Sequence, residues 1–272
     1  MKRQSLHSSA MHATTSLIDE FLPGNTELVI SLTTYSKRIH DVYLVIESLG
    51  EQTIKANKIV LWLDEAEFSM DMLPEILKKQ AHRGLDIRFC SNIRSYKKLI
   101  PSLKAFPDAD IITVDDDILY PHDLVELLLK EKQRFPQHVV GTRAHTMTSD
   151  NGVVQPYKQW GYEASFEKNG PSTFLTTGAG TLFPAGIRHE DFCDEESFMK
   201  LCPSADDIWI NLMCVKHGIP RAKIHDDRAF SLRFMQLGEH QDIALNNDNV
   251  HQNQNDVQAK RVMEQFNIKL RK

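Results

Sequence analysis

Three consecutive aspartates, Asp115, Asp116 and Asp117, directly follow a segment, Asp110 to Val114, with the composition of a buried strand. Adjacent carboxylates repel one another, and leaving them unpaired beside a buried strand is unfavourable. A divalent cation relieves this conflict, and carboxylate oxygens are ligands that suit Mg²⁺ and Mn²⁺. Residues i and i+2 of an extended segment point the same way, so Asp115 and Asp117 are predicted to face one metal ion, with Asp116 outside the site. The alternative is a solvated acidic turn that caps the helix starting near Pro121.

Polar residues also follow two other predicted strands. Thr33, Thr34 and Tyr35 come after the first strand, Leu28 to Leu32, and Asp64 ends the second. In an open parallel sheet, ligands bind outside the carboxyl ends of the strands. We therefore expect these residues to meet the three aspartates at one edge of the sheet. For Asp64 the alternative is a simple cap at the end of its strand.

A basic segment precedes the aspartates. Lys97 lies near the start of a predicted helix, Tyr96 to Ala105, where an ammonium group and a helix N-terminus can together neutralise a diphosphate. Lys98 and Arg94 are similar candidates, and Arg38 is a weaker one. The alternative is that these side chains are ordinary solvated charges.

Two further motifs lie in the second half of the chain. Gly178 and Gly180 precede a short strand, and glycines permit a close approach of the backbone to a ligand. The alternative is a tight turn into an edge strand. Asp206 and Asp207 begin a predicted helix. Helix capping explains one of these aspartates, but it does not account for two of them beside Trp209.

The elements that position these residues alternate between strand and helix up to about residue 135. Short apolar runs predict strands, and a 3.6-residue period predicts helices. The strands are expected at Leu28 to Leu32, Lys58 to Leu63, Leu85 to Cys90 and Asp110 to Val114, and the helices at Ile39 to Gln52, Pro74 to His82, Tyr96 to Ala105 and Leu124 to Phe135. This order predicts an α/β fold with a mainly parallel sheet covered by helices on both faces.

Beyond residue 136 the pattern is richer in loops. Strands are expected at His138 to Thr142 and Thr181 to Phe183, and a helix at Asp206 to His217, which Gly218 ends. The second half therefore adds a smaller, irregular part to the predicted sheet.

The composition of the 272-residue chain is that of a globular protein, with 41% hydrophobic and 25% charged residues. A net charge of -5 indicates no broad nucleic-acid-binding face. The four cysteines form no close pairs, which favours free thiols in a reducing compartment. We find no apolar stretch long enough for a membrane span and no secretory signal. We therefore expect a cytoplasmic location, which leaves peripheral attachment to a membrane open.

In the order and placement of its motifs, the chain resembles glycosyltransferases of the GT-A fold, close to the family 2 enzymes that use nucleotide-diphospho-sugars. In that family a strand carries an Asp-x-Asp motif, matched here by Asp115 and Asp117. The resemblance implies a Rossmann-like sheet, with Asp115 at the nucleotide ribose or the metal and Asp117 on a Mn²⁺ or Mg²⁺ ion. It also implies that Asp64 binds the base, normally uracil, and that Lys97 and the turn of Thr33, Thr34 and Tyr35 hold the nucleotide. This turn lacks the family's usual proline.

The second half resembles the family in two segments. Gly178 and Gly180 resemble a glycine pair that lines the pocket for the donor sugar and the acceptor. Asp206 and Asp207 resemble an acidic pair that supplies the general base. We choose Asp207, with Asp206 next, because an inverting transfer needs a carboxylate to take the proton of the acceptor hydroxyl.

Aromatic and histidine residues complete these expectations. Trp160 and Trp209 are candidates either for stacking on sugar rings or for packing. Some GT-A enzymes complete the metal shell with one histidine near the C-terminus, for which the candidates are His225, His240 and His251.

The implied function is transfer of a sugar from a UDP-linked or related donor to a hydroxyl of a glycan or a lipid-linked glycan, in surface polysaccharide synthesis. The implied domain covers residues 27–235, with a nucleotide-binding half (27–135) and an acceptor half (136–235). Residues 1–26 are expected to be an N-terminal extension with a short helix around Thr15 to Phe21, and residues 236–272 a mobile segment followed by a helix.

Two other functions are alternatives to the transferase. A sugar-phosphate nucleotidyltransferase shares the sheet and the carboxylates, but it typically has a glycine-rich loop after the first strand, which this chain lacks. A catalytically inactive sugar- or nucleotide-binding scaffold is disfavoured by the two intact acidic motifs.

Overall fold

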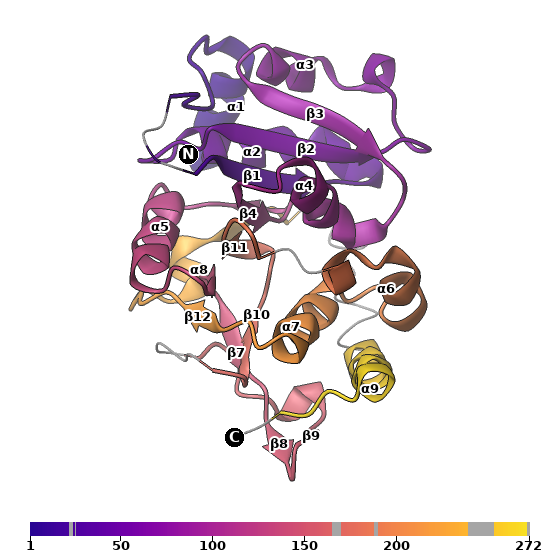
Figure 1. Cartoon of the computed structure of the whole chain (residues 1–272). Coiled ribbons are helices and arrows are strands. Elements are labelled where there is room, and N and C mark those ends of the chain that lie inside the picture. Colours follow the sequence, from indigo (N-terminus) through magenta and orange to yellow (C-terminus); the bar gives the residue numbers. More distant parts are fainter. Residues whose placement is uncertain (22–23, 25, 165–169, 188–189, 239–252, 271–272) are drawn as a thin grey trace.

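The computed structural model describes the chain except for residues 22–23, 25, 165–169, 188–189, 239–252 and 271–272. At its centre lies a seven-stranded sheet in the order β12-β6-β11-β4-β1-β2-β3 (Figure 1). The strands of this sheet are β1 (Leu28–Thr33), β2 (Lys58–Asp64), β3 (Leu85–Cys90), β4 (Asp110–Val114), β6 (Val139–Gly141), β11 (Ala179–Phe183) and β12 (Arg221–Lys223).

The first half of the sheet is parallel, as the sequence predicts. Strand β1 pairs in parallel with β2 on one side and β4 on the other, and β2 pairs in parallel with β3. Strand β11 is antiparallel to both β4 and β6, which makes the sheet mixed rather than wholly parallel. The predicted mainly parallel α/β fold is therefore confirmed.

Each face of the sheet is covered by helices because alternate residues of each strand enter opposite cores. Leu28, Ile30 and Leu32 of β1 pack in the first core, whereas Val29 packs in the second. The first core is covered by α1 (Lys2–His12), α2 (Val42–Gly50), α3 (Glu75–Ala81) and α5 (Leu124–Arg134). The second is covered by α4 (Ile100–Ala105), α6 (Glu195–Leu201), α7 (Asp206–Lys216) and α9 (Gln254–Phe266).

The helix predicted from Tyr96 begins later than expected. A 3-10 turn, η3 (Arg94–Lys98), comes first, and Pro101 stands in the first turn of α4, where its missing N–H costs nothing. A similar 3-10 turn, η1 (Ser36–His40), precedes α2. Both turns follow the carboxyl ends of strands and carry basic side chains into the region of the aspartates.

The remaining elements are short, and most of them belong to the second half of the chain. They are β5 (Ile118–Leu119), β7 (Ala144–Thr146), β8 (Ser149–Asp150), β9 (Val153–Val154), η4 (Tyr157–Gln159), β10 (Thr173–Leu175), η5 (Glu190–Cys193), α8 (Phe230–Arg233) and β13 (Met235–Gln236), and a further 3-10 turn in the first half is η2 (Met70–Met72). Strand β7 pairs with β10, and β5 pairs with β13.

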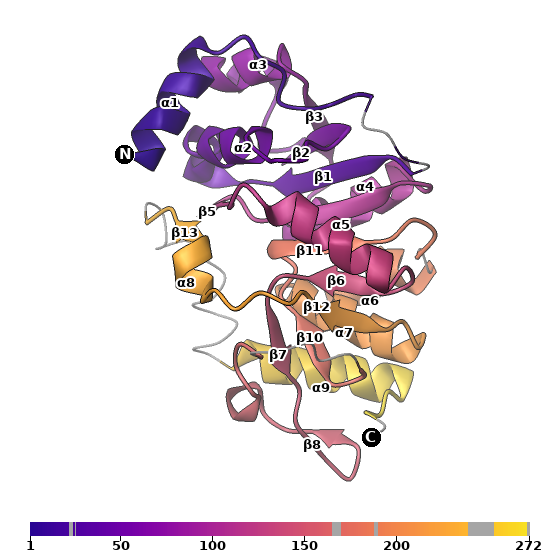
Figure 2. The same cartoon turned by 90° about the vertical axis from the view of Figure 1, so that its left-hand side faces the viewer.

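Both ends of the chain pack on the domain. Helix α1 lies against α2 and α3 through Leu6 and Ala10, both buried (Figure 2). It replaces the helix expected around Thr15 to Phe21, a segment with no helix in the structure, so that expectation was wrong. Helix α9 lies against α7, where the rings of Trp209 and Phe266 are 5.8 Å apart. Within the described parts of the chain, no helix has the length and apolar character needed to cross a bilayer.

Candidate active site

A cavity of about 800 Å³ opens at the carboxyl ends of β1 and β4 and continues into the second half of the chain. Its walls combine the turn after β1, the basic turn η3, the aspartates after β4, the segment before β11 and the start of α7. Nine of the residues predicted as site residues line it: Thr33, Thr34, Tyr35, Lys97, Asp115, Asp117, Gly178, Asp206 and Asp207. The topology thus brings together motifs that are up to about 170 residues apart.

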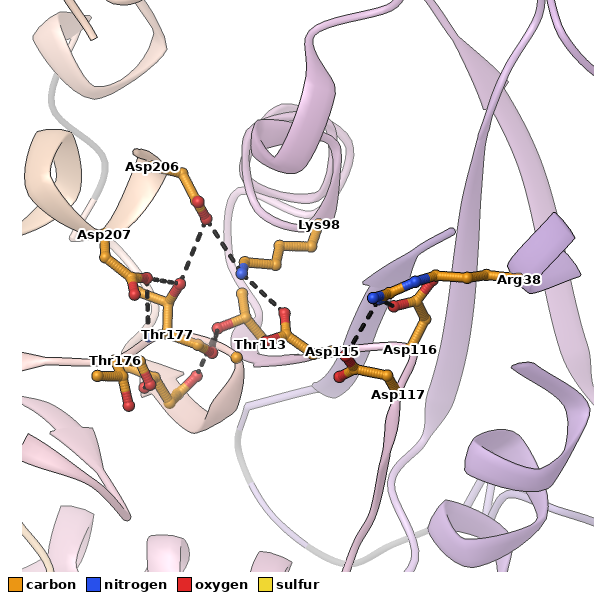
Figure 3. A network of polar contacts seen from close by, with 12 residues as sticks. Arg38, Lys98, Thr113, Asp115, Asp116, Asp117, Thr176, Thr177, Asp206 and Asp207 are labelled. Carbon is orange, nitrogen blue, oxygen red and sulfur yellow. Dashed lines mark hydrogen bonds and ion pairs between the residues drawn. The ribbon is translucent and has the colours of Figure 1, made fainter. Parts of the chain in front are cut away.

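Lys98 joins the two acidic motifs across this cavity. Its Nζ atom lies 2.9 Å from Asp115 Oδ1 and 3.1 Å from Asp206 Oδ2 (Figure 3). The side chain is buried, and burial alone would lower its pKa. The surrounding carboxylates outweigh burial and raise the pKa of Lys98 well above its usual value. Lys98 is therefore a permanent positive charge between the motifs.

Arg38 of η1 pairs with the other two aspartates. Its Nη1 atom donates to Asp116 Oδ1 at 2.7 Å and lies 3.2 Å from Asp117 Oδ2, and Thr34 Oγ1 donates to Asp116 Oδ2 at 2.6 Å. Asp116 is buried, which raises its pKa to about 6 in spite of these partners. The sequence analysis placed Asp116 outside the site, but in the structure Asp116 also lines the cavity, where it holds Arg38 beside Asp117.

Asp207 is held by the segment before β11. Thr177 donates to Asp207 Oδ1 twice, from its backbone N at 2.9 Å and from Oγ1 at 2.5 Å. Asp207 Oδ2 has no hydrogen-bond partner among the described residues. Burial and the neighbouring Asp206 raise the pKa of Asp207 to about 6, against the opposing effect of Lys98. Asp207 thus lines the cavity with a carboxylate whose pKa is suited to proton transfer near neutral pH.

Gly178 makes room for Asp115. The backbone N of Asp115 donates to Gly178 O at 3.0 Å, and the two residues are so close that no side chain fits on Gly178. Tyr120 Oη also donates to Gly178 O and lies 2.7 Å from the backbone N of Asp115. Gly178 lines the cavity as predicted, through its contact with a motif aspartate.

Two predicted site residues stand behind the cavity wall. Asp64 is buried, accepts a hydrogen bond from the backbone N of Ala66 at 2.9 Å, and is not among the lining residues. Gly180 has φ of +96° and faces Leu124 in the first core, so it serves the backbone turn and does not line the cavity. For Asp64 the structure favours the alternative of a cap at the end of its strand. For Gly180 it shows a turn into β11, which lies between β6 and β4 and not at an edge of the sheet.

The two tryptophans are packing residues. Trp209 is fully buried and packs against Phe198 and Phe266. Trp160 is 6% exposed and packs against Phe174. Neither lines the cavity.

Of the two adjacent lysines, Lys98 pairs with the aspartates and Lys97 does not. Lys97 lines the cavity, and its Nζ atom lies 3.4 Å from Asn92 Oδ1. Burial lowers the pKa of Lys97, with Asp64 opposing this effect. Adjacent lysines in a 3-10 turn point in different directions, and the sequence pattern does not say which of them meets the aspartates.

Carboxylates are suitable ligands for a hard divalent cation, but only two of the predicted ligands, Asp115 and Asp117, line the cavity. Asp115 and Asp117 line the cavity with side chains 40% and 20% exposed, and each also contacts one basic side chain. Among the described residues no group of three acidic, histidine or cysteine side chains gathers around one point. Mg²⁺ is commonly held by one or two carboxylates together with water and substrate phosphates, and two carboxylates fit that pattern.

The histidines predicted for the metal shell do not add to this set. His225 is 52% exposed and does not line the cavity. His240 and His251 lie outside the described residues.

Sequence reasoning overlooked the aromatic wall on the acceptor side. Tyr157, Tyr162, His145 and Phe174 line the cavity there, and Asn255 of α9 also lines it. An aromatic cluster in a loop-rich segment was the available signal. No sequence signal points to the contribution of α9, because Tyr157, which Asp256 of this helix contacts, lies 99 positions earlier in the chain.

No family model matches the chain, and no curated protein matches its sequence. Two solved structures of residues 1–349 of S. aureus TarS, a GT-A-like glycosyltransferase, resemble it in fold. The first has a TM-score of 0.51 at 13% identity and covers 88% of this chain and 66% of TarS. The second, in complex with UDP, has a TM-score of 0.48 at 12% identity over 74% of this chain and 58% of TarS. The chain thus spans less than two thirds of these TarS structures, and its fold is of the GT-A type.

Proposed function

We propose that the chain is a glycosyltransferase that moves a sugar from a nucleotide-diphospho-sugar, with UDP as the expected nucleotide, to a hydroxyl acceptor with inversion. The observation that carries the proposal is the Asp115–Lys98–Asp206 link, which places the candidate base Asp207 in the same cavity as the aspartates after β4. One cavity thus offers a polar cradle for a nucleotide and a carboxylate for proton removal. Both are needed for this reaction, and a binding scaffold needs no such base.

The donor would lie along the β1, η3 and β4 side of the cavity. Thr33, Thr34 and Tyr35 form the turn at the end of β1, where open α/β sheets bind their ligands. Lys97 and the exposed Arg94 line the same side and supply positive charge for a diphosphate. Asp64 lies behind this wall. It would influence the donor only indirectly, through its charge near Lys97 and its hydrogen bond at the end of β2.

The acceptor would lie on the α7 side, where Asp207 acts as the base. As the acceptor oxygen forms its bond to the anomeric carbon, the bond from that carbon to the diphosphate oxygen breaks, and the diphosphate leaves with both electrons. The acceptor proton passes to Asp207. Thr177 holds one carboxylate oxygen of Asp207, Oδ1, and the other oxygen would take the proton. Attack opposite the leaving group inverts the anomeric centre.

Mn²⁺ or Mg²⁺ is the proposed cofactor, held by Asp115 and Asp117. When bound, the ion would offset negative charge on the leaving diphosphate. Lys98 and Arg38 place two positive charges beside these carboxylates and orient them. A glycan or lipid-linked glycan acceptor, a role in surface polysaccharide synthesis and a cytoplasmic, peripherally membrane-associated location belong to the proposal as expectations of the family resemblance.

A donor-hydrolysis assay tests the proposal. The full chain is incubated with UDP-glucose, UDP-galactose or UDP-N-acetylglucosamine with and without Mn²⁺, and UDP release is measured. Asp207→Asn should lose most of the activity, whereas Asp71→Asn, an equal charge change at an exposed residue of η2, should not change it. Release of pyrophosphate from a nucleoside triphosphate and a sugar phosphate would instead support a nucleotidyltransferase. The absence of both activities would support a binding scaffold and contradict the proposal.

A further inference from the structure

The segment that leads into β11 is anchored by three buried hydroxyl groups. The acceptors are the backbone O atoms of three consecutive residues, Thr177, Gly178 and Ala179, and the donors are, in the same order, Thr113 Oγ1 at 2.7 Å, Tyr120 Oη and Thr142 Oγ1 at 2.5 Å. The three donor residues are buried and do not line the cavity. Side chains behind the cavity wall thus hold the backbone of this segment.

A bulge in the sheet explains why hydroxyl groups are needed here. The pairing of β11 with β4 shifts register between Ala179 and Thr181, so Gly180 is an extra residue on β11. A bulge disrupts the regular ladder of backbone hydrogen bonds, and the buried carbonyl oxygens beside it need other donors. The hydroxyl groups supply them and fix a segment that the ladder alone does not.

This segment contacts both acidic motifs of the site. Thr177 donates to Asp207 Oδ1 from its backbone N and its Oγ1, and Figure 3 shows Thr177 between Thr113 and Asp207. The next residue, Gly178, accepts from the backbone N of Asp115 at 3.0 Å. A shift of the segment would therefore change the distance between the candidate base and the aspartate after β4.

Of the three hydroxyl groups, that of Tyr120 contacts both sides of this junction. Tyr120 Oη donates to Gly178 O, and it lies 2.7 Å from the backbone N of Asp115, from which it accepts. One hydroxyl group thus uses its proton on one segment and its lone pair on the other. It closes the gap between the metal motif and the segment that holds Asp207.

The position of the Tyr120 hydroxyl is set from outside the site. The backbone N of Tyr120 donates to Ser48 Oγ of α2 at 3.2 Å, and Lys2 Nζ of α1 donates to Tyr120 O at 3.2 Å. The ring meets that of Phe234 edge to face, with centroids 5.9 Å apart. The first core therefore holds Tyr120 at its backbone and its ring, and its hydroxyl is presented to the site in one place.

We propose that Tyr120 is a positioning residue, whose hydroxyl holds the backbone of Asp115 against Gly178 and thereby fixes the metal-binding aspartate relative to the segment that orients Asp207. Tyr120 acts through these residues, because it does not line the cavity. This role rests on the proposed function for the chemistry of the site, but the hold on the backbone can be measured without turnover.

Tyr120→Phe tests the role, because it removes the hydroxyl and keeps the ring. Amide hydrogen exchange of the full chain, followed by NMR, reports the backbone. The amide of Asp115 loses an acceptor and should exchange about tenfold faster, which is the scale of one hydrogen bond. The amide of Thr177 should also exchange faster, whereas those of β2 and β3 should keep their wild-type rates.

The second readout is the Mn²⁺ requirement of donor hydrolysis, measured with the three UDP-sugars named above. The Mn²⁺ concentration at half-maximal rate should rise about tenfold in Tyr120→Phe, as expected when a partner behind a metal ligand is lost. Tyr43→Phe removes the same kind of group, which lies 2.8 Å from His7 Nδ1, and should keep the wild-type requirement. Leu77→Ala in the core under α3 should lower the stability and also keep it.

Two results would overturn the proposal: wild-type exchange at Asp115 in folded Tyr120→Phe, or faster exchange with an unchanged Mn²⁺ requirement. Faster exchange in a chain that hydrolyses no donor in any variant would remove the proposed function and leave the hold of Tyr120 on Asp115 in place. If Tyr120→Phe does not fold, Ser48→Ala removes the acceptor of the Tyr120 backbone N and should shift both readouts in the same direction.

Discussion

A Cβ atom on Gly178 would lie 1.6 Å from Asp115 Oδ2 and 2.0 Å from Asp115 Cγ, so the carboxylate of Asp115 occupies the space that any other residue at 178 would need. Gly178 does not have a positive φ, so an alanine there would meet no backbone strain. The glycine serves the position of Asp115, and its loss would affect the site rather than the fold.

The first prediction is that Gly178→Ala displaces the Asp115 carboxylate and lowers kcat/KM for donor hydrolysis by about 100-fold, as a displacement near 1 Å can in a catalytic site. The melting temperature should stay close to that of the wild type. Gly180→Ala is the matched control: its φ of +96° and the 2.6 Å approach to Leu124 predict a loss of stability instead. If Gly178→Ala and Gly180→Ala lowered the melting temperature equally, the assignment of Gly178 to the site and of Gly180 to the fold would be contradicted.

The second prediction concerns Lys98, which lowers the pKa of Asp207. Lys98→Met removes this charge with little change in volume. The base must be ionised, so wild-type kcat/KM should fall about tenfold per pH unit below the pKa of Asp207, which is about 6. In Lys98→Met this acid limb should move to higher pH, in addition to a lower plateau. A pH profile of donor hydrolysis measures both, and an unmoved limb would show that Lys98 does not act on Asp207.

The third prediction is that the ionised carboxylate of Asp207 lowers the stability of the folded protein. The pKa of Asp207 is raised from 3.8 to about 6, so the folded state favours the protonated form. Protonated Asp207 therefore contributes to the free energy of unfolding. This contribution is fully present below pH 3.8 and is lost as the pH rises through about 6. Asp207→Asn cannot ionise, and its amide oxygen can still accept from Thr177.

The variant should therefore be more stable than the wild type at pH 7.5, by on the order of 2 kcal/mol, and the difference should vanish near pH 4. Thermal unfolding at the two pH values measures it. A less stable variant at pH 7.5 would mean that the hydrogen bonds from Thr177 need the carboxylate.

The sheet and the edge that carries the site could be predicted because they depend on local patterns. The apolar runs of β1, β2 and β4 have no amphipathic period, so each must be buried on both faces, and parallel pairing then brings their carboxyl ends together. This logic alone places Thr33 and Asp115 in one cavity.

The partners of these residues could not be predicted because they depend on turn geometry and long-range packing. The left-handed φ of 54° at Arg94 begins η3, and this turn directs Lys98 rather than Lys97 to the aspartates. Gly178 and Gly180 look alike in the sequence, but only the first faces the cavity. The contact of Tyr157 with Asp256 spans 99 positions, a distance over which no sequence period gives information.

The fourth prediction concerns the metal. Asp117→Ala should weaken Mn²⁺-dependent binding of UDP by more than about tenfold, because the loss of a ligand costs at least as much as the loss of an outer partner. The fold should be kept, since Arg38 retains its bond to Asp116. Calorimetric titration of UDP at several Mn²⁺ concentrations measures it. Wild-type affinity in this variant would remove Asp117 from the metal site.

The fifth prediction concerns Arg38 and Asp116, whose side chains are 8% and 6% exposed. Arg38→Met leaves the buried carboxylate of Asp116 without its counter-charge, which should destabilise the fold by about 3–5 kcal/mol. Adding Asp116→Asn removes the buried negative charge that Arg38→Met leaves without a partner. The double variant should therefore recover most of the lost stability. Chemical denaturation of the two single variants and the double variant gives the coupling energy between the residues.

The same set of variants separates stability from function at this pair. The double variant should be folded but weak in UDP binding, because Arg38 is no longer present to orient Asp117. If the double variant bound UDP as well as the wild type, Asp116 and Arg38 would serve the fold alone. If it were no more stable than Arg38→Met, the burial of Asp116 would not be the cause of the loss, since the neutral amide carries no charge that needs a partner.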